Sequence, residues 1–193
     1  DGIDGLLGGI SLVVFSACAY LMYWSEQYNK LYICILFILA IIPFMLMNLG
    51  VLGKMRKVFM GDAGSMMLGF TIVWLLLSAS QQNENTNIIR PVICLWLIAL
   101  PIFDMVSIVL RRLSKGNSPF LPDRQHFHHL LHASGYDQIR TLLIICGISL
   151  CFALIGIVGE GYQISETYMF LGFVVTFIVY HTVLSKLSKR LEQ

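Results

Sequence analysis

The chain has 193 residues, of which 57% are hydrophobic and only 12% are charged, and its formal net charge is +2. Soluble domains carry roughly 25% charged residues, so this composition excludes an ordinary soluble domain and predicts an integral membrane protein. We expect membrane lipid, and no nucleic acid, among its partners.

Apolar runs recur along the whole chain, and about 20 residues suffice to cross a bilayer. Six such runs cover residues 6–24, 31–49, 66–78, 88–110, 139–158 and 168–187. The third run is short, which predicts a broken or tilted span. The sequence therefore predicts an all-α integral membrane protein, with about six transmembrane helices in a single multi-span domain over residues 1–193.

The basic residues are unevenly distributed over the connections between these runs. Eleven of the thirteen Lys and Arg residues follow the second, fourth or sixth run. The positive-inside rule then predicts that the loops at about 50–65 and 111–138 and the C-terminus face the cytoplasm. The five cysteines fall inside apolar runs without metal-ligand spacing, which predicts reduced packing residues.

The chain opens on Asp1-Gly2-Ile3-Asp4-Gly5. If this segment is helical, Asp1 and Asp4 share a face, and the glycines let a ligand approach the backbone closely. An N-cap with a flexible lead-in explains the same residues equally well.

A second motif, residues 57–65, precedes the third apolar run. Free N–H groups at the start of a helix attract anions, and Asp62 offers oxygen to Mg²⁺, which favours few carboxylates plus substrate phosphates. Phe59 offers a flat face on which a base can stack. Alternatively, Asp62 or Ser65 caps the helix and Phe59 anchors it at the membrane interface.

The third motif is the loop 117–129, which is rich in histidine. Four of the five histidines lie within seven positions, at 126, 128, 129 and 132. No cysteine lies near, which disfavours zinc, whereas histidine together with Arg124 suits the binding of phosphate. A solvated loop beside anionic headgroups is the alternative.

Two polar residues lie in the apolar runs themselves. Asp104 follows Pro101 in the fourth run, and an intramembrane carboxylate is a functional candidate by default. It could instead pair with Arg111 or with a polar group of another helix. Asn48, near the end of the second run, is a weaker candidate, because a satisfied interhelical amide is the commoner outcome.

Together, Asp1-Gly-Ile-Asp-Gly-Leu6, Val58-Phe-Met-Gly-Asp-Ala-Gly-Ser65 and Asp123-Arg-Gln-His-Phe-His-His129 resemble the polyprenyl-phosphate N-acetylhexosamine-1-phosphate transferase family. The sequence of residues 118–129 resembles that of the WecA type of this family, which uses undecaprenyl phosphate and UDP-GlcNAc. Family members are about twice this length and carry an earlier Asp-Asp motif. We therefore expect this chain to be the C-terminal half of a longer transferase.

The resemblance implies transfer of GlcNAc-1-phosphate from UDP-GlcNAc to undecaprenyl phosphate, with release of UMP. This is the first step of lipid-linked surface glycan synthesis of the O-antigen or common-antigen type. The resemblance also implies Mg²⁺ as cofactor, with Mn²⁺ as the alternative, and a place in the bacterial cytoplasmic membrane. A homodimer is compatible with it.

The resemblance assigns roles to individual residues. Asp62 matches the metal-binding aspartate, and Phe59 matches the aromatic residue near the uracil. The remaining matches are Asp1, Gly2 and Asp4 for the segment that lines the nucleotide and active site, and Arg124, His126, His128 and His129 for the loop that contacts the substrate's phosphates or sugar. Asp104 matches a Pro-x-x-Asp pattern of the WecA branch.

Two other classes of function remain open from the residues alone. A transporter or channel would explain the intramembrane Asp104 and the proline-broken spans. A membrane scaffold or regulator without catalytic activity is the third hypothesis.

Overall fold

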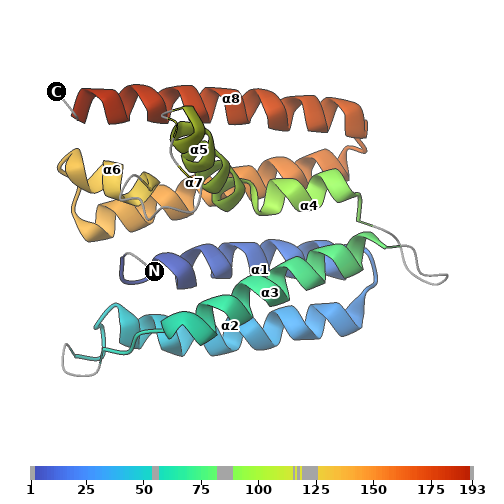
Figure 1. The fold of residues 1–193 in the computed structure, drawn as a ribbon. Helices are drawn as coiled ribbons and strands as arrows, with labels where there is room; N and C mark the ends of the chain where they lie inside the picture. The colour runs from blue at the N-terminus through green and yellow to red at the C-terminus, as the bar shows by residue number, and fades with distance from the viewer. Residues whose placement is uncertain are drawn as a thin grey trace.

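The computed structural model describes residues 3–53, 57–81, 89–114, 116, 118 and 126–191 of the chain. Within them all regular secondary structure is helical (Figure 1). The helices are α1 (Leu6–Trp24), α2 (Tyr28–Asn48), α3 (Gly61–Ser80), α4 (Pro91–Leu97), α5 (Ala99–Ser114), α6 (Phe127–Ala133), α7 (Gln138–Gly161) and α8 (Glu166–Leu191).

Five of these helices, α1, α2, α3, α7 and α8, are long and apolar enough to cross a membrane. The bent pair of α4 and α5 makes a sixth crossing if it is counted as one span. The structure therefore confirms the prediction of an all-α membrane protein with about six spans. Large apolar side chains such as Leu36, Phe70 and Leu143 are exposed on α2, α3 and α7, as expected where helices face lipid.

The third span is longer than its apolar run and is not broken, because α3 runs as one helix of 20 residues from Gly61 to Ser80. Residues 61–65 of the second motif therefore form the start of the span itself, and residues 57–60 precede it. Gly61 has a φ of +67°, which favours glycine at this entry to the helix. The helix lies obliquely to α1 and α2 (Figure 1), which fits the tilted alternative of the prediction.

The fourth span is broken, although its apolar run, residues 88–110, is continuous in the sequence. The axes of α4 and α5 differ by 78° on either side of Ile98. Pro101 explains the position of the break, since it has no N–H to donate to the carbonyl of Leu97 and its ring crowds that turn. As a result α5 runs steeply across α7 and α8 (Figure 1). By contrast, Pro43 lies inside α2 without ending it.

The core forms around α1, which lies between α2 and α7, and around the aromatic side chains of α5, α7 and α8. Phe103 of α5 is fully buried. Its ring centroid lies 4.8 Å from that of Phe173 and 5.5 Å from that of Phe152. These contacts hold α5 against α7 and α8, and they fix the backbone next to Asp104.

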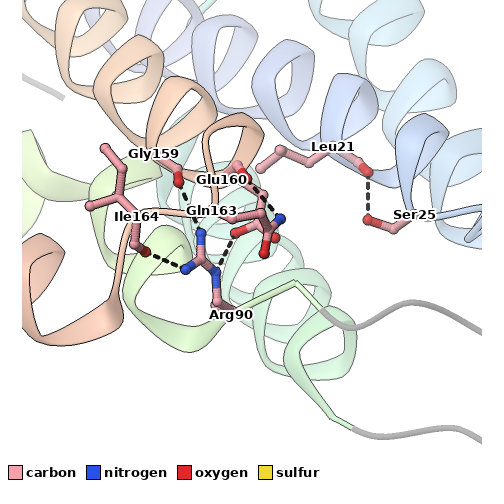
Figure 2. A network of polar contacts seen from close by, with 7 residues as sticks. All are labelled: Leu21, Ser25, Arg90, Gly159, Glu160, Gln163 and Ile164. Atoms are coloured by element: carbon pink, nitrogen blue, oxygen red, sulfur yellow. Dashed lines mark hydrogen bonds and ion pairs between the residues drawn. The ribbon is translucent and has the colours of Figure 1, made fainter.

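The helices alternate in direction, so the connections gather at two ends of the bundle (Figure 1). One end carries the start of α1, the end of α2, the start of α3 and α6, and we call it the site end. The opposite end is closed by Arg90 (Figure 2). Its guanidinium donates to Glu160 Oε2 at 2.8 Å, to the carbonyl of Gly159 at 2.9 Å and to the carbonyl of Ile164. Arg90 thereby ties the start of α4 to the connection between α7 and α8.

Candidate functional site

The opening motif forms a turn rather than a helix in its described part. Residues 3–5 precede α1, and Gly5 has a φ of +82°. The proposal that Asp1 and Asp4 share a helical face is therefore not tested, because Asp1 and Gly2 lie outside the described residues. Asp4 itself forms an ion pair with Lys57, which comes from the second motif.

The ion pair changes the chemistry of Asp4. The hydrogen bond from Lys57 is the largest cause that holds the pKa of the Asp4 carboxyl below its ordinary value, and a hydrogen bond from Gln138 adds to it. Since both groups stabilise the carboxylate form, Asp4 stays ionised at neutral pH. Lys57 thus joins the candidate site, although the sequence pointed to it only as a basic residue of a cytoplasmic loop.

Asn48 connects the same two motifs through its amide group. Its Oδ1 accepts a hydrogen bond from the Gly5 N–H at 2.5 Å, and its Nδ2 donates to the carbonyl of Val58 at 2.8 Å. The side chain is buried. Asn48 is therefore the satisfied interhelical amide that the sequence favoured, and it holds the starts of α1 and α3 at fixed positions beside the end of α2.

Asp62 lies in the first turn of α3 and is exposed. Neither Asp62 nor Ser65 caps the helix, because the N-cap position is Met60 and no side chain makes the capping hydrogen bond. The Ser65 hydroxyl donates to the Asp62 carbonyl at 2.9 Å instead. Within the described residues, the Asp62 carboxylate has no hydrogen bond or ion pair, so its oxygens face solvent at the positive end of a helix.

Phe59 precedes this turn, and 67% of its surface is exposed. An aromatic ring with so much exposed surface packs little of itself into the protein. Its exposed face suits both the predicted stacking of a base and the alternative of an anchor at the membrane interface.

The histidine segment is held by Asp104. The Asp104 Oδ2 lies 2.9 Å from His126 Nδ1, and its Oδ1 accepts a hydrogen bond from the backbone N–H of Phe127 at 3.0 Å. The Tyr180 hydroxyl of α8 donates to Oδ1 at 3.4 Å. Asp104 thus pairs with groups of α6 and α8 and fixes the start of α6.

A cavity of about 430 Å³ adjoins these residues. Its polar side is formed by Asp104, His126, His128 and His129, and its apolar side by residues of α1, α5, α7 and α8. Such a cavity suits a ligand with a charged head and an apolar body, because each part meets surface of its own kind.

His128 differs from His126 in its surroundings. Burial is the main cause that lowers the pKa of His128 to about 4, and the neighbouring His129 and His126 add to this effect. The His128 ring centroid lies 4.1 Å from that of His129 and 5.7 Å from that of His126. Its Nε2 is buried and has no hydrogen-bond partner among the described residues. His128 is therefore a neutral imidazole at pH 7.

The structure brings the predicted residues together in two groups at the site end. One group contains Asp4, Lys57 and Asn48, and the other contains Asp104, His126 and its histidine neighbours. In the described part of the chain, no hydrogen bond or ion pair joins Asp62 to either group, and Arg124 lies outside that part. Tyr180 was missed by the sequence reasoning, because a tyrosine near the end of an apolar run carries no signal that separates it from a packing residue.

Comparison with known proteins identifies a family and several transferases to which the chain is similar. The family model described as glycosyl transferase family 4 matches residues 1–80. An undecaprenyl-phosphate alpha-N-acetylglucosaminyl 1-phosphate transferase of Yersinia pestis is 48% identical over 181 residues, which are 93% of this chain and 49% of the relative. The protein of the same name in Escherichia coli K12 is 44% identical over the same shares of both chains.

The relative of that name in Haemophilus influenzae is 46% identical over 175 residues, which cover 90% of this chain and 49% of the relative. The chain thus spans about half the length of the curated relatives it matches. No solved structure matches the chain. Residues 1–80 of the chain are thus similar to glycosyl transferase family 4, and nearly the whole chain is similar to about half of these transferases.

Proposed function

We propose that the complete protein encoded by this gene transfers GlcNAc-1-phosphate from UDP-GlcNAc to undecaprenyl phosphate. An oxygen of the lipid phosphate attacks the sugar-bearing phosphorus, the bond to the UMP oxygen breaks, and UMP leaves with the bonding electrons. The products are UMP and a lipid-linked GlcNAc pyrophosphate. The names of relatives 44–48% identical to this chain support this choice of substrates.

The observation that carries the proposal is the cavity with a polar and an apolar side at the site end. The acceptor is a phosphate on a long hydrocarbon chain, and the donor is soluble and anionic. Catalysis must therefore bring a membrane-embedded nucleophile to a soluble substrate, and positioning supplies much of the rate. Polar groups at one end of a membrane bundle are suited to that task.

The residues present are compatible with Mg²⁺ bound in part by substrate. No group of three or more His, Cys, Asp or Glu side chains in the described ranges could enclose a metal ion. Mg²⁺ is commonly held by one or two carboxylates together with substrate phosphates and water, and the exposed carboxylate of Asp62 offers such a ligand. Bound there, the ion would offset the negative charge of the phosphates; Mn²⁺ favours the same oxygen ligands.

The protein's own groups contribute the rest of the binding. The N–H groups at the start of α3 attract phosphate oxygens, and Phe59 stacks on the uracil ring. His126, His129 and Arg124 donate hydrogen bonds to phosphate or sugar oxygens. Asp1, Gly2 and Asp4 line the nucleotide side. The basic residues of the site-end loops support a site that faces the cytoplasm, in a protein of the bacterial inner membrane.

The transporter hypothesis has less support from the structure. Its motivating residue, Asp104, is engaged with His126 and Phe127 at the site end. A carboxylate held in this way serves the histidine segment rather than an ion path through the bundle.

The test uses the purified complete protein in lipid nanodiscs containing undecaprenyl phosphate, with labelled UDP-GlcNAc and Mg²⁺. We expect UMP and lipid-linked GlcNAc to form in equal amounts. Absence of both products would contradict the proposal and favour a scaffold, and substrate-dependent ion flux in sealed vesicles without transfer would favour a transporter.

A further inference from the structure

Asp104 receives hydrogen bonds from three directions. The backbone N–H of Phe127 and the hydroxyl of Tyr180 both donate to its Oδ1, at 3.0 and 3.4 Å. His126 Nδ1 lies 2.9 Å from Oδ2. Both Asp104 oxygens act as acceptors in this arrangement, and the contact with Oδ2 therefore assigns the donor role to His126 Nδ1.

Because Nδ1 is engaged with Asp104, Nε2 is the ring nitrogen through which His126 can contact a ligand. The His126 side chain is 41% exposed and lines the cavity, whereas the Asp104 side chain is 20% exposed. The carboxylate therefore supports the ring from the protein side, while part of the ring remains accessible to a ligand. A hydrogen bond to one imidazole nitrogen commonly sets the role of the other.

The support is rigid. The residue before Asp104, Phe103, is fully buried among aromatic rings of α7 and α8. The bend between α4 and α5 brings this segment across α7 and α8 toward α6 (Figure 1). The carboxylate thus belongs to a fixed part of the fold and not to the loop that it holds.

We propose that Asp104 is a positioning residue that fixes the tautomer and the orientation of His126, so that Nε2 meets a phosphate of the substrate. Nε2 accepts the proton of the phosphate, and the imidazolium so formed donates a hydrogen bond back to the phosphate oxygens. Asp104 itself touches no reacting atom. This inference rests on the proposed transferase function and assigns Asp104 a role within it.

The substitution Asp104→Asn separates positioning from folding. Asparagine has nearly the same shape, but only one of its two terminal atoms accepts hydrogen bonds. The Phe127 N–H can only donate, so it keeps the oxygen, and the amide NH₂ turns toward His126 Nδ1. The ring must then move its proton to Nε2. D104N therefore keeps the support of α6 and reverses the tautomer.

The first readout is a double-mutant cycle on UMP release by the complete protein, with D104N, H126Q and the double variant. We expect D104N to lower kcat about 10- to 100-fold, in the range for losing one preorganised hydrogen bond, with a smaller change in KM. In the H126Q background, D104N should lower kcat by less than about twofold. A full additional loss in that background would mean that Asp104 acts without His126, and would overturn the inference.

The matched control is Asp137→Asn. Asp137 caps α7 by accepting a hydrogen bond from the Arg140 N–H at 2.8 Å, and it does not line the cavity. Because Asp137, like Asp104, accepts a hydrogen bond from a backbone N–H at the start of a helix, D137N makes the same chemical change outside the cavity. D137N should leave kcat within about twofold of the wild type. An equal loss in both variants would attribute the effect to helix capping and overturn the inference.

The second readout needs no activity. The ¹⁵N chemical shifts of the His126 ring, in the complete protein labelled at histidine, report which nitrogen carries the proton. We expect a protonated Nδ1 in the wild type and a protonated Nε2 in D104N. An unchanged tautomer would overturn the inference even if the enzyme is active, whereas an inactive wild type with the expected shifts would overturn only the proposed function.

Discussion

The ion pair between Asp4 and Lys57 links two motifs that lie 53 residues apart in the sequence. The local sequence around each residue does not predict this contact. The Asp4 motif has the pattern of a segment that leads into a helix, and Lys57 is one of several basic loop residues. Their contact depends on how the starts of α1 and α3 meet beside α2. Sequence reasoning could therefore name Asp4 as a site residue but could not identify its partner.

Lys57→Met should raise the pKa of Asp4 toward its ordinary value. Because the folded protein holds that pKa low, the contribution of the pair to stability is present above about pH 4, where an unfolded aspartate ionises. It is lost as the pH falls through the folded pKa. The melting temperature of K57M should thus lie below that of the wild type at pH 7, and the two should converge below about pH 4.

Arg140→Met is the control for this measurement. Arg140 and Asp137 are 3.9 Å apart at the same end of the bundle, but their side chains are 72% and 62% exposed. Exposed pairs contribute little, so R140M should melt close to the wild type at both pH values. A pH-independent difference between K57M and wild type would contradict the account of Asp4.

His128 should make the protein sensitive to mild acid. Its pKa of about 4 in the folded state lies below the ordinary value near 6.5, so the unfolded chain binds the extra proton first. Stability therefore falls as the pH decreases from about 6.5 to about 4. His128→Gln removes this dependence, and thermal unfolding of the two proteins over that range checks it.

His132→Gln is the matched control in the same helix. The His132 side chain is exposed, and its ring Nδ1 lies 3.0 Å from the carbonyl of Tyr136. If H132Q changes the pH profile as H128Q does, burial of His128 is not the cause.

At the scale of elements, Asn48 joins the start of α1, the end of α2 and the segment before α3. Asn48→Ala removes the partner of the buried Gly5 N–H and of the Val58 carbonyl, whose hydrogen bond is partly buried. Such a loss costs about 1–3 kcal/mol. We expect a lower melting temperature, measured in the same detergent for both proteins.

Asn29→Ala makes the same substitution at the other end of α2, where the side chain is exposed. It should leave the melting temperature nearly unchanged. Equal effects of N29A and N48A would show that helix propensity, and not the bridging amide, accounts for the loss.

The elements also show where sequence patterns suffice. Apolar runs gave the spans of α1, α2, α7 and α8 to within a few residues, because a bilayer demands length and hydrophobicity and little else. The start of α3 was missed, since Gly61, Asp62 and Gly64 do not look like helix interior. The size of the bend at Ile98 was not predicted, because a proline marks the place of a kink while tertiary packing decides its angle.

At the scale of the molecule, the alternating helices place α6 and the connection between α7 and α8 at opposite ends (Figure 1). The succession of apolar runs predicted this alternation for the described helices, but it could not predict that Asp104 reaches α6. That contact needs the 78° bend, which no local pattern encodes.

The placement of the connections at two opposite ends of the bundle predicts from which side of the membrane a single cysteine can be labelled. In a cysteine-free background, Ser134→Cys after α6 should react with a membrane-impermeant maleimide only from the cytoplasmic side of vesicles. Gln163→Cys, in the connection between α7 and α8, should react only from the opposite side. Labelling of both positions from one side would contradict the fold.

The most direct test of the proposed transferase is the effect of Asp62→Asn on UMP release by the complete protein with UDP-GlcNAc, undecaprenyl phosphate and Mg²⁺. Asp62 has no structural partner among the described residues, so D62N should fold normally. We expect D62N to melt at the wild-type temperature and to lose UMP release by at least about 100-fold, as for removal of a group that stabilises transition-state charge, while D137N retains UMP release. UMP release at the wild-type rate by D62N would contradict the account.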